Sequence, residues 1–280
     1  KTPPCTKSII KSGIKEVIYS IDDIDKKVKG KSFKILKNNK IKVKRGILKK
    51  ETNELYNSYF INRKYKLPFV TAKIAISKNR LIYSEGTKRI TNQISDKISH
   101  YLRFKNDAIM ISSKTLNIDN PKLDCRLKGF ENFSPKRIIL DRDLDINLNT
   151  NIFKSSNKNN TIIFYNSSNN YKIKILKKKG IILIKSKLDN KKRFDLRIIK
   201  KKLFSLGVRN LLIEGGDKLT KIMLDNKLID QFYLFKSPKN LSKIKNYVIF
   251  TSYDILKNKY KIKSKITSNL AKDNITIYKR

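Results

Sequence analysis

The sequence predicts an α/β protein, and three observations support this fold class. Short apolar runs alternate along the chain with segments of helical periodicity, as strands and crossover helices do. The apolar run at 211–213 ends in Glu214, Gly215 and Gly216 directly before a helical pattern, a junction at which α/β proteins bind anionic ligands. Apolar residues make up 39% of the 280 residues, which is enough for one large or two moderate cores.

In the first part of the chain, helical and strand patterns alternate. Pro3 and Pro4 are typical of a helix start and Gly13 of a helix end, which sets the bounds of the first helix. The expected elements are a helix over 4–12, a strand over 17–20, a helix over 30–38, a strand over 41–43 and a longer helix over 50–63. Pro68 follows, and we place a domain boundary there, between a first domain at 1–66 and a second at 67–280.

The second domain repeats the α/β order. Thr91 precedes an amphipathic segment and is expected to open its helix. Leu196, Ile199 and Leu203 mark one apolar face of a later helix. The expected strands lie at 69–76, 108–112, 137–140, 161–165, 181–184 and 211–213, and the expected helices at 92–104, 195–206 and 218–226. The strand at 211–213 is expected to be buried on both faces.

A formal charge of +43 raises the question of a nucleic-acid partner. The lysines are spread over all predicted elements, however, and the chain has no arginine-rich tract or zinc-finger spacing. We therefore expect non-specific, salt-sensitive binding and no specific nucleic acid.

No apolar run is long enough to cross a membrane, and Cys5 and Cys125 form no disulfide framework, so a cytoplasmic location is expected. Because residue 1 is a lysine, we expect that the natural chain starts further upstream.

Five segments of the chain occur in the order and spacing of one family. They are Lys1-Thr2-Pro3-Pro4-Cys5, Val28-Lys29-Gly30-Lys31, the stretch 68–77 from Pro68 to Ser77, the stretch from Thr115 through Asp119-Asn120-Pro121 to Arg126, and Leu212-Ile213-Glu214-Gly215-Gly216. On these segments the chain resembles the bifunctional deaminase/reductase of riboflavin biosynthesis over nearly its whole length. The resemblance implies the C-terminal half of a cytidine-deaminase-like domain at 1–66, followed by a dihydrofolate-reductase-like domain at 67–280.

In that family the first domain is a zinc-dependent pyrimidine deaminase, which binds its metal through a histidine and two cysteines. Cys5 matches the last of these zinc ligands, but the others are missing, and the one histidine of the sequence, His100, lies in the second domain. The metal site is therefore incomplete, and we expect zinc and deamination only in a full-length parent. Asp23 and Asp25 match a substrate-contacting loop that has lost its two prolines, so a solvated acidic turn is the preferred interpretation.

The family reaction of the second domain is NADPH-dependent reduction of 5-amino-6-(5-phosphoribosylamino)uracil to the ribitylamino compound. The resemblance implies a catalytic role for Lys73 and for Glu214, which also contacts the substrate. It implies cofactor contacts for Ala75, Thr115, Asp119, Gly216, Asp217, Lys218 and Leu219. It implies substrate contacts for Thr87, Arg103, Leu123 and Arg126, of which the two arginines hold the phosphate. Pro121 is expected to fix a loop that carries Thr115 and Asp119.

Several positions depart from the family pattern. Arg89 replaces a tryptophan, Arg142 replaces a small polar nucleotide contact, and Lys78-Asn79-Arg80 replaces the usual Leu-Asp-Gly. Asp217 puts a negative charge at a helix start that is meant for a phosphate, and it can cap that helix instead. Asp230 also matches a family position, and we assign it a structural role.

Three alternative functions remain open at this point. The first, within the same family, is that only the intact parent enzyme is active. A second alternative is a basic nucleic-acid-binding protein with a vestigial reductase fold. A third is a folate reductase, which is disfavoured because Arg103 and Arg126 with the Asp119-x-Pro121 loop suit a phosphorylated sugar better than a pterin tail. A homodimer is an expectation of the family resemblance only.

Overall fold

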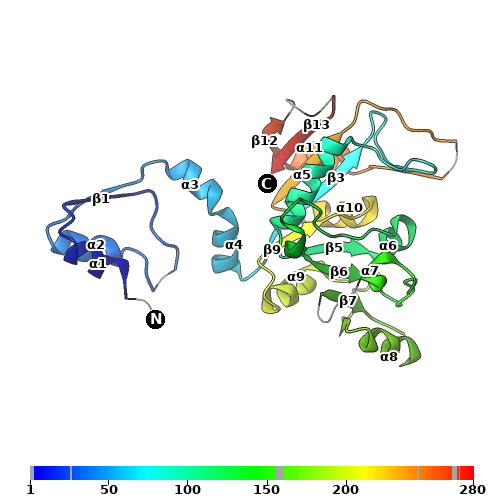
Figure 1. The fold of residues 1–280 in the computed structure, drawn as a ribbon, viewed down its shortest axis with the longest axis horizontal. Helices are drawn as coiled ribbons and strands as arrows, with labels where there is room; N and C mark the ends of the chain where they lie inside the picture. Colours follow the sequence, from blue (N-terminus) through cyan, green and yellow to red (C-terminus); the bar gives the residue numbers. More distant parts are fainter. Residues whose placement is uncertain are drawn as a thin grey trace. The chain divides into compact units, whose positions relative to one another are not determined.

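The chain consists of two compact units, Lys1–Leu67 and Pro68–Arg280 (Figure 1). The computed structural model describes residues 3–25, 27–155, 160–168, 170–244, 246–266, 270 and 272–280. Lys1 and Thr2, which open the first segment of the family resemblance, lie outside the described residues. The predicted α/β class is confirmed in both units, where parallel strands alternate with helices.

The first unit is built on a small parallel sheet. Its elements are α1 (Cys5–Lys11), β1 (Glu16–Tyr19), α2 (Lys31–Asn38), β2 (Lys42–Arg45), α3 (Lys49–Leu55) and α4 (Asn57–Tyr65). β1 and β2 pair in parallel, with Val17 opposite Val43. Thr6, Leu36 and Ile41 are buried, and most other side chains of the unit are partly or fully exposed. The first four predicted elements are confirmed to within two residues at each end.

The single helix predicted over 50–63 is wrong, because the structure has two helices there. The break lies at Tyr56, whose φ of −92° and ψ of 9° fall at the edge of the helical region. Neither α3 nor α4 buries a described residue, so little tertiary packing supports a single continuous helix across Tyr56. Asn57 begins the second helix, as expected of a residue whose side chain competes for backbone hydrogen bonds inside a helix.

The described residues of the second unit form a nine-stranded sheet, in the order β12-β13-β10-β3-β9-β5-β6-β7-β8 (Figure 1). The strands are β3 (Phe69–Ile76), β5 (Ala108–Ser112), β6 (Lys136–Leu140), β7 (Thr161–Tyr165), β8 (Ile182–Lys185), β9 (Asn210–Ile213), β10 (Gln231–Lys236), β12 (Lys261–Ile266) and β13 (Asn274–Lys279). Neighbours from β10 to β8 pair in parallel, whereas β13 is antiparallel to β10 and β12. The six predicted strands of this unit are confirmed to within one residue at each end.

Helices cover both faces of this sheet. They are α5 (Gln93–Phe104), α6 (Ser113–Asp119), α7 (Asn151–Lys154), α8 (Asn170–Lys178), α9 (Leu196–Ser205), α10 (Asp217–Asp225) and α11 (Tyr253–Lys259), with a short 3-10 helix at Glu131–Phe133. One core cluster joins the sheet to α9, α10 and α11, and the other joins it to α5 through α8. Leu211 and Ile213 of β9 enter the first cluster and Leu212 the second, so this strand is buried on both faces as predicted.

Two strands of the second unit stand apart from the large sheet. β4 (Leu81–Ser84) and β11 (Tyr247–Ile249) pair antiparallel and form an arm, which we call the β4–β11 arm. Neither strand was predicted, because each is only three or four residues long. β10, β12 and β13 were missed as well. No helix in the described part of the chain is long and apolar enough to cross a membrane.

Two expectations about helix caps are wrong. Thr91 is buried, and Asn92 caps α5 instead, because its side chain accepts the N–H of Ser95 at 2.9 Å. Asp217 does not cap α10: it is the first residue of that helix, and Gly216 occupies the capping position without a side-chain bond. The carboxylate of Asp217 instead accepts the N–H of Thr251 at 2.9 Å and its hydroxyl at 2.6 Å.

Asp230 links the start of β3 to β10 and to the end of the chain. Its carboxylate, on a residue that is 7% exposed, accepts the N–H of Val70 at 2.8 Å and lies 3.6 Å from the guanidinium of Arg280. Burial raises the pKa of Asp230, while the buried ammonium of Lys200 on α9 acts in the opposite direction. Lys200 also donates to the carbonyl of Leu228 at 3.2 Å. These contacts fit the structural role assigned to Asp230.

We expect Asp230→Ala to lower the free energy of unfolding by about 3 to 5 kcal/mol, because it leaves Lys200 buried without its partner charge. The matched control is Asp225→Ala, which removes a carboxylate that pairs with Lys221 and Lys259 on the surface. We expect that change to cost about 0 to 1 kcal/mol. Denaturant unfolding of the two variants measures both values, and equal losses would contradict a special role for the buried carboxylate.

Candidate functional site

A pocket of about 360 Å³ lies where three parallel strands reach their carboxyl ends. β9 is hydrogen-bonded between β3 and β5. After β5 the chain continues to β6, β7 and β8 on one side, whereas after β9 it continues to β10 on the other side of β3. Where the chain connections that follow adjacent parallel strands run in opposite directions, a crevice opens at this edge of the sheet. Ligands bind in such crevices in open α/β sheets.

The predicted catalytic and cofactor residues all line this pocket. They are Lys73, Ala75, Thr115, Asp119, Glu214, Gly216, Asp217, Lys218 and Leu219. β3 supplies the first two, α6 the next two, and the end of β9 with the start of α10 the others. The structure thus brings together side chains that are as much as 146 positions apart, from position 73 to position 219.

Lys73 is half-buried on β3, and its ammonium faces the pocket. Its Nζ lies 5.0 Å from the ring centroid of Phe235 on the neighbouring strand β10. Burial lowers the pKa of Lys73, and the nearby carboxylate of Glu214 offsets part of this effect. A lysine in this setting gives up its proton more readily than a solvated one.

Glu214 follows β9 and is held by two hydrogen bonds from one arginine. Nε and Nη2 of Arg103 donate to the two carboxylate oxygens at 3.0 and 2.8 Å. The side chains are 13% exposed for Arg103 and 12% exposed for Glu214. Burial alone raises the pKa of Glu214, but Arg103 and then Lys73 outweigh it, so that the pKa lies below its usual value. Glu214 is therefore an ionised carboxylate at neutral pH.

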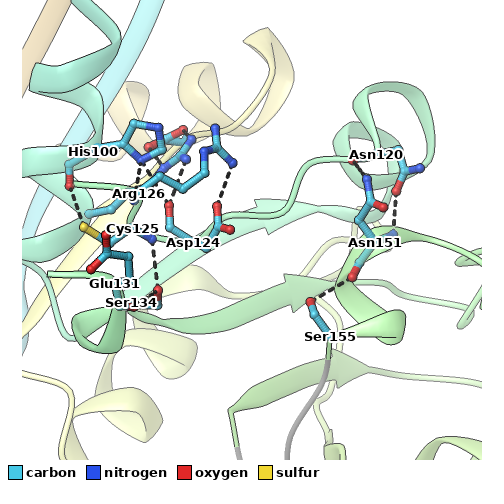
Figure 2. Close-up of polar contacts among 11 residues, drawn as sticks. His100, Asn120, Asp124, Cys125, Arg126, Glu131, Ser134, Asn151 and Ser155 are labelled. Atoms are coloured by element: carbon cyan, nitrogen blue, oxygen red, sulfur yellow. Dashed lines mark hydrogen bonds and ion pairs between the residues drawn. The ribbon is translucent and has the colours of Figure 1, made fainter. Parts of the chain in front are cut away.

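Arg103 also holds the segment 124–126, which lies outside the pocket lining. Its Nη1 donates to the carbonyl of Asp124 at 3.1 Å. Figure 2 shows this segment beside His100, whose Nδ1 lies 3.2 Å from the N–H of Arg126. Burial, together with Arg103 and Arg126, lowers the pKa of His100, and Nδ1 also lies 3.2 Å from the carbonyl oxygen of Asp124. Arg126 itself is 54% exposed and pairs with the carboxylate of Asp124 at 2.7 Å.

Thr115 and Asp119 lie on helix α6, so the prediction that a loop carries them is wrong. Ser112 ends β5 and caps α6 through its hydroxyl, which accepts the N–H of Thr115 at 3.3 Å. Thr115 in turn accepts the N–H of Gly216 at 3.2 Å. The helix ends at Asn120, where φ is 40°, and the side chains of Asn120 and Asn151 connect this end to α7 (Figure 2).

The start of α10 lies at the pocket. No described side chain caps this helix, as in α7 and α11, whereas α5, α6 and α9 are each capped by a side chain. Free N–H groups at a helix start bind phosphates, and the exposed ammonium groups of Lys114 and Lys218 line the same pocket. Gly215 packs closely against Leu219, because a Cβ there would lie 2.9 Å from a terminal methyl carbon of that side chain. These groups fit the phosphates of a nicotinamide dinucleotide.

The β4–β11 arm contributes pocket residues that the sequence analysis missed. Ile82 and Tyr83 of β4 and Val248 of β11 line the pocket, as do Ile90 and Lys114. The bonds from Thr251 to Asp217 join the end of β11 to the start of α10. A short strand near residue 81 could have been expected from Leu81 and Ile82, but its paired residues on β11 lie 163 to 168 positions away. No local pattern indicates such a pairing.

Five predicted residues do not line the pocket. Four of them are the predicted substrate contacts Thr87, Arg103, Leu123 and Arg126, of which Leu123 is buried with a φ of 57°. Cys5 is an exposed, free cysteine of the first unit. In the described ranges no group of three or more histidine, cysteine, aspartate or glutamate side chains could hold a metal ion.

Comparison with known proteins adds independent evidence. The family described as the RibD C-terminal domain matches residues 68–276. The riboflavin biosynthesis protein RibD of Aquifex aeolicus is 30% identical over 283 residues, covering 100% of this chain and 77% of that protein. The RibD of Actinobacillus pleuropneumoniae is 29% identical, covering 85% of this chain and 63% of that protein.

Solved structures of the same fold support the match. A diaminohydroxyphosphoribosylaminopyrimidine deaminase/5-amino-6-(5-phosphoribosylamino)uracil reductase from Thermotoga maritima superposes with a TM-score of 0.78 at 26% identity, covering 99% of this chain and 75% of that chain. Acinetobacter baumannii RibD has the same fold, with a TM-score of 0.80 at 23% identity, covering 99% of this chain and 76% of that chain. The family match over residues 68–276 and the relative that is 30% identical over the whole chain show that this protein belongs to the RibD family of riboflavin biosynthesis proteins.

Proposed function

We propose that the second unit is an NADPH-dependent reductase of riboflavin biosynthesis, which converts 5-amino-6-(5-phosphoribosylamino)uracil to its ribitylamino product. The observation that carries this proposal is the pocket at the ends of β3 and β9, where Lys73 and Glu214 lie beside the start of α10. The Thermotoga relative carries this substrate in its name. A charged pair next to a phosphate-binding helix start suits a reaction between a dinucleotide and a phosphorylated sugar.

NADPH, when bound, would supply the hydride, and the chain's own residues would bind and orient the reactants. The free N–H groups of α10, with Lys114 and Lys218, would hold the cofactor phosphates. The ammonium of Lys73 would face the sugar, where it can donate a hydrogen bond or a proton. Glu214 would contribute a fixed negative charge next to Lys73, because Arg103 already occupies both of its oxygens.

The substrate's phosphate would bind beyond the pocket lining, at the segment 124–126, which Arg103 connects to Glu214. Arg126 is 54% exposed and pairs with the partly buried Asp124, so its guanidinium can turn toward a phosphate. Thr87 and Leu123 belong to the same proposed substrate side through the family resemblance. A pyrimidine carrying a phosphoribosyl group is thus the proposed substrate class, with no specific nucleic acid as a partner.

The first unit would be the C-terminal part of a zinc deaminase domain, and Cys5 one of its zinc ligands in a full-length parent. The chain spans 77% of the Aquifex relative and 63% of the Actinobacillus relative, and we propose deamination for a full-length parent only. The two free cysteines suit a reducing compartment, and we propose a cytoplasmic location. A homodimer remains part of the proposal on family grounds.

The direct test measures NADPH oxidation by the purified protein with and without 5-amino-6-(5-phosphoribosylamino)uracil, at moderate salt. We expect oxidation that depends on this substrate, and formation of the ribitylamino product by mass spectrometry. Dihydrofolate in its place distinguishes a folate reductase, and we expect no turnover with it. Oxidation with dihydrofolate but not with the pyrimidine would overturn the proposed function.

We expect Lys73→Met to lower kcat/KM by roughly 100-fold or more while the protein stays folded, because it removes a charge that faces the reacting sugar. The control is Lys185→Met, which removes an exposed lysine at the end of β8, away from the pocket. Circular dichroism and steady-state kinetics of both variants provide the measurement. Equal activity of the two variants would remove Lys73 from the mechanism.

We expect Asp217→Ala to raise KM for NADPH by roughly tenfold, because the lost bonds to Thr251 release the β4–β11 arm from α10. Asp217→Asn keeps an acceptor for the N–H of Thr251 but carries no charge. We expect this variant to have a KM equal to or below that of the unchanged protein, since a phosphate at the helix start meets less repulsion. If KM for NADPH falls in both variants, then repulsion between Asp217 and the cofactor phosphate has a larger effect than the hydrogen bonds that connect the β4–β11 arm to α10.

A further inference from the structure

We infer that the ring of Tyr83 stacks on the nicotinamide of the cofactor and that it favours the oxidised, positively charged form of that ring. Tyr83 takes this role only if the pocket binds a nicotinamide cofactor, so the inference rests on the proposed function. The observation that carries it is the place of Tyr83 on the β4–β11 arm. Among the described residues that line the pocket, Tyr83 is the only aromatic one.

Tyr83 lies on the face of the arm that is turned toward the pocket. It is paired directly with Val248 of β11 in the antiparallel ladder, and directly opposite residues project from the same face. Both residues line the pocket. The neighbouring Ile82 packs against the apolar core of the sheet and its helices, so it offers less free surface to a ligand.

The side chain of Tyr83 has no partner of its own. It is partly buried, and within the described ranges no hydrogen bond, ion pair or ring contact engages it. Other tyrosines of the chain differ: the hydroxyl of Tyr19 donates to Asp22, and that of Tyr260 donates to the carbonyl of Ile229. At the wall of a pocket, such a free ring leaves an aromatic face for a ligand.

The arm holds Tyr83 in a fixed place. Directly before β4, the side-chain amide of Asn79 donates to the carbonyl of Leu241 at 2.8 Å and accepts the N–H of Leu241 at 3.0 Å. At the other end of β4, the hydroxyl of Ser84 donates to the carbonyl of Ser242 at 2.9 Å. The far end of β11 is bonded to the start of α10. A ring held in this way loses little conformational freedom when a ligand binds.

The arm belongs to the cofactor side of the pocket. Its bonds to α10 place it next to the helix start that is proposed to hold the cofactor phosphates. The segment 124–126, proposed for the substrate phosphate, is bonded instead to α5 and lies outside the pocket lining. Hydride transfer requires that nicotinamide and sugar face each other. The arm therefore contacts the face of the nicotinamide that is turned away from the substrate.

The proposed reaction gives this contact a chemical role. A hydride would pass from the nicotinamide C–H bond to the imine carbon of the opened sugar, and a proton would join the imine nitrogen. Because the hydride takes both electrons of its bond, a pyridinium cation remains. An aromatic face attracts a cation, and this attraction grows as the positive charge develops. Tyr83 would thus stabilise the transition state more than the ground state, which raises kcat.

A single fluorescent reporter tests the contact directly. The sequence contains no tryptophan, so Tyr83→Trp introduces one indole on the arm. NADP⁺ does not absorb where indole emits, and it quenches the emission only when the rings touch. We expect NADP⁺ to quench most of the emission of Tyr83→Trp, and adenosine 2′,5′-bisphosphate, which has no nicotinamide, to leave it unchanged. The control is Tyr171→Trp on α8, where the tyrosine is 75% exposed and lies outside the pocket lining.

Binding affinities test the preference for the charged ring. Calorimetry reports Kd for NADP⁺ and NADPH in Tyr83→Leu, which removes the ring, and in Tyr83→Phe, which keeps it. For Tyr83→Leu we expect Kd to rise by roughly tenfold for NADP⁺ and by less than about threefold for NADPH. For Tyr83→Phe we expect both values within about twofold of those of the unchanged protein. Tyr247→Leu is the matched control, because it removes an exposed tyrosine of the same arm that does not line the pocket.

The outcomes separate this inference from the proposed function. Unquenched emission of Tyr83→Trp while calorimetry shows bound NADP⁺ would overturn the inference alone, as would equal losses for NADP⁺ and NADPH in Tyr83→Leu. If the unchanged protein binds neither form of the cofactor, both the proposed function and the inference fail. Quenching and a selective loss of NADP⁺ without any turnover would support the inference and count against the proposed reaction alone.

Discussion

The position of β9 between β3 and β5 is the constraint on which the rest of this molecule depends. Backbone hydrogen bonds to both neighbours hold β9 in parallel register, with Leu211 opposite Val70 on one side and Ala108 on the other. The strands therefore end at the same edge, and whatever follows β9 must lie next to Lys73. Glu214 and the start of α10 follow it. The pocket is a consequence of strand order and not of any local motif.

Burial then decides the electrostatics of the pocket. Lys73 and Glu214 are both removed from water, and this desolvation disfavours the charged form of each side chain. The attraction between their opposite charges offsets part of that effect. The two-pronged contact from Arg103 tips the balance for Glu214 toward the ionised form. The carboxylate of Asp217 has uncharged partners instead, because the hydroxyl and the backbone N–H of Thr251 both donate hydrogen bonds to it. A carboxylate at the start of a phosphate-binding helix is tolerated there because its oxygens already have partners.

Compensation between buried charges also stabilises the sheet at the opposite end of β3. Asp230 and Lys200 are both buried, and each compensates the other while also bonding to backbone groups. In a chain with a net charge of +43, the interior carboxylates are few and each one carries a defined contact. The excess of lysine stays on the surface, where long side chains keep their charge in water.

The sequence by itself determined most of the secondary structure and the chemistry at the strand end. Apolar runs such as 69–76 and 108–112 predicted β3 and β5 to the residue, and Glu214-Gly215-Gly216 predicted a ligand-binding junction, because strand and helix periods are local properties. Tertiary structure alone decided the rest. Three sets of contacts join residues from 34 to more than 100 positions apart. They are the pairing of β4 with β11, the hydrogen bonds from Thr251 to Asp217, and the hydrogen bonds from Arg103 to Glu214. Such contacts depend on the order of the strands and the packing of α5, and no local pattern encodes them.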